Sequence, residues 1–351
     1  MNHGRLDEAE RDFRRVLQLR PQTGGAYANL GVVHMRRKEW GKALENLEKA
    51  ERLMPQVAGI RLNIGLAYYR QNEFAKAIPV FESVVRDQPD AAEARNLLGQ
   101  CYFFTKRWAD AASTLEPLWA QHSEEPHYLY MLSKAAHLAG QKDLDERAWD
   151  QLMKVGDSGA AGFHLLMGNE FLQLGQWDSA LGELQIEAQA NPNLPYVHYY
   201  LGQTYLKKQE FEHAREEFLK DAAIEPNVAA NYDELGETYW LMQDDANAEK
   251  SYREALLRDP GLANSHLGLA RIYQRQEKYA AALVEIDSTI KLDAARSDVH
   301  YMRGQVLLHL DRKDEAKKEV AEAARLESED RAQPEKHQET APSPALLQEP
   351  Q

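Results

Sequence analysis

The chain has 351 residues, a formal net charge of −14 at pH 7 and a single cysteine, Cys101. This acidic balance argues against general nucleic-acid binding, because neutralising phosphates requires a basic surface. One cysteine excludes an internal disulfide and gives no metal-binding framework. The sequence contains no apolar run of about 18 residues, and its first residues, MNHGRLDEAERDF, lack the apolar core of a signal peptide. A cytoplasmic protein is therefore the default expectation.

Residues 1–23 predict a partial repeat that consists of a second helix only. Its apolar face is formed by Leu6, Ala9, Phe13 and Val16, which have the spacing of one helical stripe. Met1 falls at the repeat position of Met35, so we expect the chain to be trimmed or to have a mis-assigned start. A lone, highly charged capping helix is the alternative. A periplasmic or exported protein is the expectation if a leader lies upstream.

A period of 34 residues then runs from residue 24 to residue 330. Residues 30–55, 64–89 and 201–226 superpose position for position, as LGVVHMRRKEWGKALENLEKAERLMP, IGLAYYRQNEFAKAIPVFESVVRDQP and LGQTYLKKQEFEHAREEFLKDAAIEP. An aromatic or apolar residue opens a first helix and Leu-Gly follows; an Ala and an aromatic lie on a second helix, and a proline closes it. Each unit therefore predicts an antiparallel helix pair, which buries its apolar face only by stacking on its neighbours.

These positions resemble the tetratricopeptide repeat family in both period and residue choice. The resemblance covers about 330 residues, and it implies an all-α fold, a right-handed solenoid or superhelix of about nine helix-turn-helix repeats. The repeats lie at 24–57, 58–91, 92–125, 126–160, 161–194, 195–228, 229–262, 263–296 and 297–330. The motif is highly specific for the fold and weakly specific for the function.

The fourth repeat is the least regular. Its closing segment, LMKVGDSGAAG, has no terminal proline and contains three glycines, which release the backbone at helix ends. We therefore predict two sub-arrays, 24–142 and 163–330, with residues 143–162 as a candidate hinge. Simple sequence drift in a tolerated loop is the alternative.

Prolines and composition mark two further departures from regular helices. Pro79 and Pro117 lie inside predicted second helices, where each predicts a local kink. Residues 331–351 are rich in Pro, Gln and Glu and poor in aromatics. Such a segment cannot bury enough surface to fold, so it predicts a disordered tail.

The sequence offers no clear catalytic or metal-binding motif. Among its 12 histidines, four open first helices of different repeats: His164, His198, His266 and His300. Equivalent positions of packed helices lie about 8–10 Å apart, whereas zinc needs nitrogen ligands at about 2.0–2.1 Å, so these histidines are predicted to be structural. G-x-S-x-G, G-x-x-x-x-G-K-[ST] and H-E-x-x-H are all missing. We predict no catalytic residue, no metal and no cofactor.

First helices line the concave groove of tetratricopeptide repeat proteins, so the resemblance implies that partners bind there. The candidate groove residues are Tyr196, Tyr199, Tyr200, Gln203, Lys207, Asp233, Glu237, Trp240, Arg271, Phe103 and Asn63. Tyr, Trp and Arg dominate interface hot spots, because they bury a large rigid area and keep a polar group available. Packing of the aromatic rings against the neighbouring repeat is the alternative.

The sequence therefore predicts a protein-interaction scaffold or adaptor, without catalysis of its own, that binds an extended peptide or a partner helix. A non-catalytic recognition arm of a larger enzyme or of a secretion or assembly machine, with its other part upstream of Met1, is the second hypothesis. Small-molecule or glycan binding in the aromatic groove is the third. The expected partner is a protein or peptide, with no nucleic acid and no direct membrane insertion. Neither the partner's identity nor the oligomeric state follows from the sequence.

Overall fold

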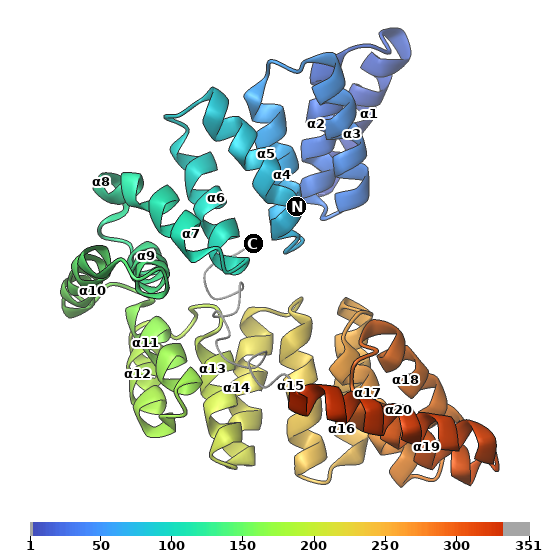
Figure 1. Ribbon diagram of the computed structural model, residues 1–351. Helices are drawn as coiled ribbons and strands as arrows, with labels where there is room; N and C mark the ends of the chain where they lie inside the picture. The colour runs from blue at the N-terminus through green and yellow to red at the C-terminus, as the bar shows by residue number, and fades with distance from the viewer. Residues whose placement is uncertain (1–2, 333–351) are drawn as a thin grey trace. The chain divides into compact units, whose positions relative to one another are not determined.

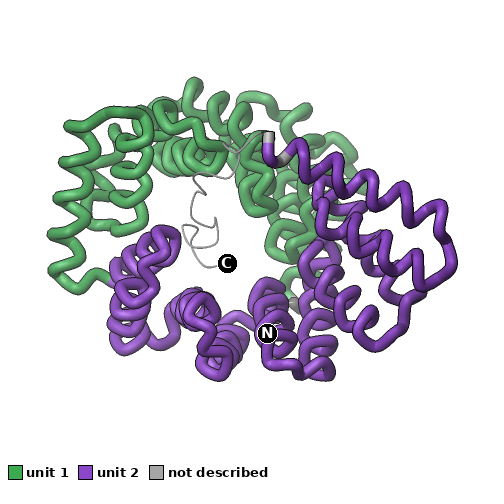
Figure 2. The backbone as a smooth tube through the Cα atoms, turned by 60° about the horizontal axis from the view of Figure 1, so that its bottom comes forward, with its two compact units in different colours: residues 1–160, 343–348 green, residues 161–342, 349–351 purple. Residues whose placement is uncertain are grey.

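The computed structural model describes residues 3–332, which form two units (Figures 1 and 2). Unit 1 ends at Ala160, and unit 2 begins at Ala161. The elements of unit 1 are α1 (His3–Leu19), α2 (Gly24–Arg36), α3 (Trp40–Leu53), α4 (Ala58–Tyr69), α5 (Phe74–Asp87), α6 (Ala92–Phe104), α7 (Trp108–Leu115), the 3-10 turn η1 (Glu116–Leu118), α8 (Trp119–His122), α9 (Pro126–Leu138) and α10 (Lys142–Asp157).

Unit 2 continues the same alternation of first and second helices. Its elements are α11 (Phe163–Gln173), α12 (Trp177–Ala190), α13 (Val197–Lys207), α14 (Phe211–Ile224), α15 (Ala229–Leu241), α16 (Asp245–Arg258), α17 (Ala263–Arg275), α18 (Tyr279–Leu292), α19 (Ser297–His309) and α20 (Lys313–Ala332). No strand occurs between residues 3 and 332. The predicted all-α repeat solenoid is confirmed.

Each helix pair is closed by one left-handed residue between its two helices. These residues are Lys38, Asn72, Lys106, Gly140, Gly175, Gln209, Gln243, Glu277 and Asp311, all with positive φ. The N–H of the next residue returns to a carbonyl five residues earlier, as from Gln176 to Phe171 at 2.8 Å. This six-to-one bond closes the helix end in a Schellman turn. The turn is therefore kept even where a side chain makes the left-handed conformation unfavourable.

Close approach of two helices explains the glycine near the middle of most first helices. Gly202 on α13 faces the buried ring of Phe218 on α14, and a Cβ placed at Gly202 would lie 2.7 Å from that ring. No side chain fits at this separation without moving the ring. The Leu-Gly step of the repeat therefore sets the distance between the two helices.

Gly202→Ala should lower the free energy of unfolding by about 1–3 kcal/mol, because the added methyl group overpacks the α13–α14 contact. Gly182, on α12, is the matched control, since a Cβ there meets no atom within 4 Å. Gly182→Ala should be neutral or stabilise by up to about 1 kcal/mol, through backbone entropy alone. Urea unfolding followed by circular dichroism compares the two, and equal midpoints would contradict the packing argument.

The helix α1 lies in the register of a second helix. Its residues Ala9, Phe13 and Val16 precede Ala43, Leu47 and Ala50 of α3 by 34 positions. The α3 residues are fully buried, whereas the side chain of Val16 is 39% exposed. The apolar face of α1 is thus only partly covered, by α2.

Three irregular segments have defined local structures. The boundary between the units lies within residues 143–162, where α10 is continuous to Asp157 and both Gly159 and Gly162 have positive φ. Pro79 lies inside α5, but Pro117 lies in η1 and interrupts the helix instead of kinking it. Helix α20 extends to Ala332, so the first two residues of the predicted tail are helical. Residues 333–351 lie outside the described residues.

Candidate protein-interaction face

Side chains connect the neighbouring first helices α13, α15 and α17 of unit 2. Gln203 of α13 donates to Glu234 of α15 at 3.0 Å, and Arg271 of α17 approaches Glu237 of α15 at 3.6 Å. We call this surface the α13–α15–α17 face. It comprises Tyr199, Gln203, Asp233, Glu234, Glu237, Trp240 and Arg271. The structure thus brings together six of the predicted groove residues with Glu234, the neighbour of Asp233 on α15.

Glu234 is surrounded by neutral donors. The Tyr199 hydroxyl donates to its Oε1 at 3.3 Å, and Gln203 Nε2 donates both to that oxygen and to the Tyr199 hydroxyl, each at 3.0 Å. Burial raises the pKa of Glu234, and the two hydrogen bonds offset this only in part. A half-buried carboxylate held by neutral groups favours an incoming cation.

Asp233 has a similar environment one residue earlier. Its carboxylate accepts a hydrogen bond from the hydroxyl of Ser265, a fully buried residue of α17. Burial raises the pKa of Asp233, against the lowering effect of this hydrogen bond. Ser265 is not among the predicted groove residues, because a serine near the start of a first helix carries no distinguishing signal in the sequence.

The other end of the face combines an acid, an aromatic ring and two arginines. The Tyr252 hydroxyl donates to Glu237 at 2.9 Å. The guanidinium groups of Arg271 and Arg275 lie 5.3 and 5.8 Å from the centre of the half-buried Trp240 ring. These are cation–π distances, so Trp240 is held in place from the α17 side.

Tyr196 occupies a different place from the one expected. It precedes α13 as its N-cap residue, with a left-handed φ of 69°, and its ring centre lies 6.5 Å from that of Tyr199. The buried Asp221 of α14 accepts the Tyr199 N–H at 3.2 Å and thereby caps the helix in place of an N-cap side chain. A left-handed backbone is rare for a bulky residue. The backbone conformation at the start of α13 therefore fixes where the Tyr196 side chain lies.

Two of the predicted groove residues belong to the core, and their expected exposure is wrong. Phe103 is fully buried, with its ring 5.3 Å from Trp108 and 5.8 Å from Phe104. Tyr200 is 3% exposed, and the ring of Tyr199 lies 5.4 Å from it. Both rings are covered by neighbouring aromatic side chains, which favours burial of a large apolar area.

The remaining predicted groove residues lie apart from the face or at its edge. Asn63 belongs to unit 1, where its side chain donates to the Gly59 carbonyl of its own helix at 3.0 Å. Lys207 is exposed at the C-terminal end of α13. Asn63 is therefore already engaged locally, whereas the Lys207 side chain lies exposed on the surface.

Each of the four histidines singled out in the sequence is paired with a glutamate of its own repeat. The Nδ1–Oε2 distances are 2.7 Å for His164–Glu183, 2.5 Å for His198–Glu217, 2.6 Å for His266–Glu285 and 2.7 Å for His300–Glu319. Within residues 3–332, no group of three or more His, Cys, Asp or Glu side chains is placed to hold a metal ion.

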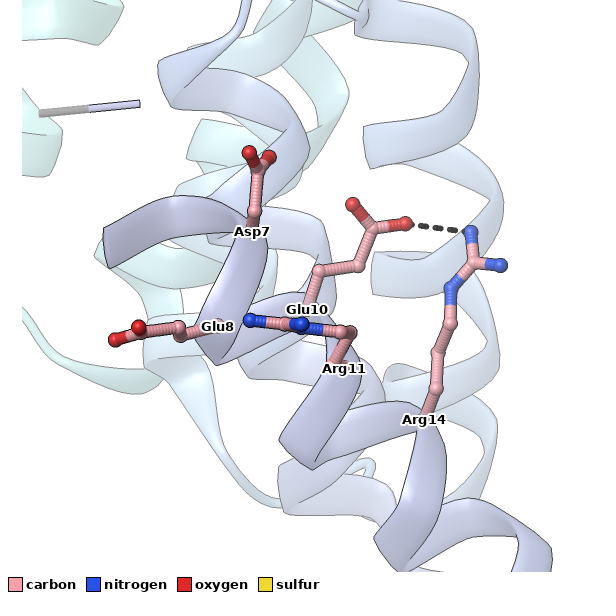
Figure 3. Close-up of a pocket in the computed structure, with 5 residues that line it drawn as sticks. All are labelled: Asp7, Glu8, Glu10, Arg11 and Arg14. Carbon is pink, nitrogen blue, oxygen red and sulfur yellow. Dashed lines mark ion pairs between the residues drawn. The ribbon is translucent and has the colours of Figure 1, made fainter. Parts of the chain in front are cut away.

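A hollow of about 510 Å³ lies beside α1 in unit 1 (Figure 3). It is lined by Asp7, Glu8, Glu10, Arg11 and Arg14, all projecting from α1. Arg14 and Glu10 form an ion pair at 2.6 Å. Ligand pockets are mostly apolar and enclosed, so this charged surface of one helix lacks the character of a small-molecule site.

Stacked helical hairpins that share side-chain contacts between successive first helices define a helical-repeat scaffold. The chain belongs to the tetratricopeptide repeat family. Two family models described as tetratricopeptide repeat match it, one at residues 1–58, 62–116, 165–233 and 267–334, the other at 229–261. Such repeats serve generally as non-catalytic scaffolds for protein partners. No curated protein matches the chain.

Solved structures resemble the chain at low sequence identity. The APC/C hetero-tetramer Cut9–Hcn1 has a TM-score of 0.55 at 16% identity, covering 88% of this chain and 60% of that chain. The MamA protein gives 0.43 at 19%, covering 51% and 95%. YrrB, described as a TPR protein with an unusual peptide-binding site, gives 0.42 at 13%, covering 49% and 89%. At 16% identity, the Cut9–Hcn1 match shows a shared fold alone.

Protein binding and a role as an interaction scaffold follow from the family. The helices between residues 3 and 332 include none that is both long and apolar enough to cross a membrane.

Proposed function

We propose that this scaffold has no catalytic activity of its own and that its α13–α15–α17 face binds an extended, basic segment of a protein partner. The observation that carries the proposal is the pair of half-buried carboxylates, Asp233 and Glu234. Their hydrogen bonds come from the neutral groups of Ser265, Gln203 and Tyr199.

The charge of the pair favours a basic partner. Burial raises the pKa of both carboxylates, so their ionised forms lack full compensation in the free protein. An ammonium or guanidinium group placed beside them would stabilise those forms. An ion pair that is partly shielded from water contributes more binding free energy than an exposed one. Binding should therefore release protons at a pH near the raised pKa values.

The aromatic side chains supply the remaining contact area. Tyr199 and Trp240 lie on the same face as the carboxylates, and both are half-buried. Their rings are already held by neighbours, Tyr199 by Gln203 and Trp240 by the arginines of α17. Rings that are already held in place lose little conformational entropy on binding. Both rings are therefore suited to pack against an extended peptide.

The test is selection of peptides from a random display library on the full chain, followed by affinity measurement of the selected peptides. We expect enrichment of Lys and Arg, and binding weakened by at least about tenfold, or about 1.4 kcal/mol, in the double variant Asp233→Asn and Glu234→Gln. These substitutions keep the acceptor oxygens that Ser265 and Gln203 use.

Glu212→Gln with Glu216→Gln is the matched control, since it removes the same charge from exposed positions of α14. It should leave the affinity nearly unchanged. Selected peptides without basic residues, or equal weakening by both double variants, would contradict the proposed face. Binding lost equally by both would indicate a general effect of net charge.

A further inference from the structure

Two positions of the repeat change together along unit 2. A histidine opening the first helix is accompanied by a glutamate 19 residues later, on the second helix. The pairs are His164–Glu183, His198–Glu217, His266–Glu285 and His300–Glu319. In the seventh repeat the same two positions hold Tyr232 and Ser251. The histidine and the glutamate are therefore present together or absent together.

In three of these repeats both ring nitrogens face acceptors. Nδ1 lies 2.5–2.7 Å from the glutamate Oε2, and Nε2 lies near a backbone carbonyl six residues earlier. The Nε2–O distances are 2.9 Å for His198–Pro192, 3.3 Å for His266–Pro260 and 3.2 Å for His300–Ala294. Each of these carbonyls belongs to the turn that ends the preceding repeat. One imidazole ring therefore contacts two successive repeats.

The protonation state decides whether both contacts are hydrogen bonds. A neutral imidazole carries one N–H, so one of its nitrogens must present a lone pair to an acceptor. A doubly protonated imidazolium donates to the carboxylate and to the carbonyl at once, and hydrogen bonds with an ionised partner are about twice as strong as neutral ones.

We propose that His198, His266 and His300 form a proton-dependent latch, which joins successive repeats of unit 2 tightly when the rings are doubly protonated and loosely when they are neutral. The latch links each first helix to its own second helix and to the turn that precedes it. Contacts between neighbouring repeats contribute directly to the stability of a solenoid, so the stiffness of unit 2 should depend on pH.

The surroundings of His198 favour the charged ring. Burial lowers its pKa, but the hydrogen bonds with Glu217 and Pro192 outweigh burial, so the net shift is upward. Lys220, on α14, opposes this shift, while Asp221 of the same helix is another negative group near the ring. For Glu217, burial raises the pKa, but hydrogen bonds with His198 and Lys220 bring it below its usual value.

The two other rings face similar groups. His266 faces Glu285 of α18 and the Pro260 carbonyl. His300 faces Glu319 and Glu322 of α20, and Arg303 of its own helix shares Glu319, with its Nη1 at 2.5 Å. Arg303 and His300 therefore share the Glu319 carboxylate.

The sign of the pH effect follows from the directions of the two shifts. A raised histidine pKa stabilises the fold fully below the unfolded value of 6.5, and this contribution is lost as pH rises through the folded value. A lowered glutamate pKa stabilises the fold above 4.5, and that contribution is lost as pH falls. The latch is therefore strongest between these values and loosens toward alkaline pH.

The chain contains its own controls. The Tyr232 hydroxyl donates to the Pro226 carbonyl at 3.3 Å, the same contact without a titrating imidazole. In unit 1, Arg95 Nη2 donates to the Pro89 carbonyl at 2.8 Å, so an arginine takes the place of the imidazole there. Helices α15 and α6 should therefore lack the effect.

The test is hydrogen–deuterium exchange on the full chain at about pH 6 and about pH 8, the range in which histidine titrates, with intrinsic rates corrected. In wild type, protection of α13 should fall by about tenfold or more at the higher pH, the equivalent of one charge-assisted hydrogen bond. The variant His198→Tyr with Glu217→Ser transplants the pair of the seventh repeat and should remove that step in α13.

A step that persists in this variant, or an equal step in α13, α15 and α6, would overturn the latch. Nitrogen-15 NMR of the wild-type imidazoles provides a readout that needs no folded variant. His198 should stay doubly protonated to a higher pH than histidine in a short peptide. A ring of His198 that is neutral at about pH 6 would also overturn the proposal.

Discussion

Replacing Tyr252 by alanine is expected to lower the free energy of unfolding by about 3–5 kcal/mol. The ring is 1% exposed, and a Cβ added at Gly236 or Gly268 would collide with it. It therefore fills the space between two successive first helices, α15 and α17. Neither Gly236 nor Gly268 has a side chain that could fill the cavity left by alanine.

Further substitutions separate the contribution of the Tyr252 ring to stability from that of its hydroxyl group. Tyr252→Phe keeps the ring and removes the hydrogen bond to Glu237, so it should destabilise by about 0.5–1.5 kcal/mol. Leu257→Ala, at a residue 78% exposed on the same helix, should stay within about 0.5 kcal/mol of wild type. Guanidinium unfolding followed by circular dichroism ranks the three, and an alanine variant as stable as the phenylalanine variant would refute the packing role.

This series also connects the core with the proposed function. The Tyr252 hydroxyl donates to Glu237, and Glu237 is the acid that Arg271 approaches. The phenylalanine variant therefore frees one carboxylate of the α13–α15–α17 face while the fold is kept. If the face binds basic segments, its affinity should change in this variant without a large loss of stability.

The periodic spacing predicted the helix pairs well, because the apolar stripe, the glycine and the closing proline each have one mechanical role per repeat. The conformation of the turns was harder to predict from the sequence. Left-handed residues close every pair, yet only Gly140 and Gly175 are glycines, and others are Lys106 or Gln209. The stacking of the two helices imposes this conformation, so the local sequence carries little signal for it.

Burial on the first helices could not be predicted from repeat register. Tyr199 and Tyr200 are consecutive residues of one helix, and both were assigned to the groove, yet only Tyr199 keeps partial exposure. Which ring is covered depends on the side chains of the adjacent repeats, which differ from one repeat to the next. By contrast, the acid that accompanies each histidine, such as Glu217 for His198, can be seen by aligning the repeats.

Removing the carboxylate of Glu187 is the second change expected to have a large effect. Helices α11 and α13 start from left-handed residues, Gly162 and Tyr196, whereas α15 starts from an extended one, Val228. Where the start is left-handed, a buried acid of the second helix accepts hydrogen bonds from the first turn of the first helix. Glu187 accepts the N–H groups of Gly162 at 3.1 Å and Leu165 at 3.3 Å.

Glu187→Ala should lower the free energy of unfolding by about 2–4 kcal/mol. It leaves two buried N–H donors without their acceptor, at about 1–3 kcal/mol each, and removal of one buried polar group offsets part of this. Asn191 Nδ2, 2.7 Å from the same carboxylate, also loses its acceptor. Glu212→Ala, on the exposed surface of α14, is the control and should be nearly neutral.

The location of the loss distinguishes a cap from general destabilisation. Because solenoid repeats open locally, hydrogen exchange should quicken first in the opening turn of α11, while α15 stays protected. Uniform quickening across unit 2 would show that Glu187 acts through the core and not through the helix start. Loss confined to α11 would show that the acid and the left-handed residue act together at this helix start, since alanine is found at the equivalent position, Ala255, where the helix start is extended.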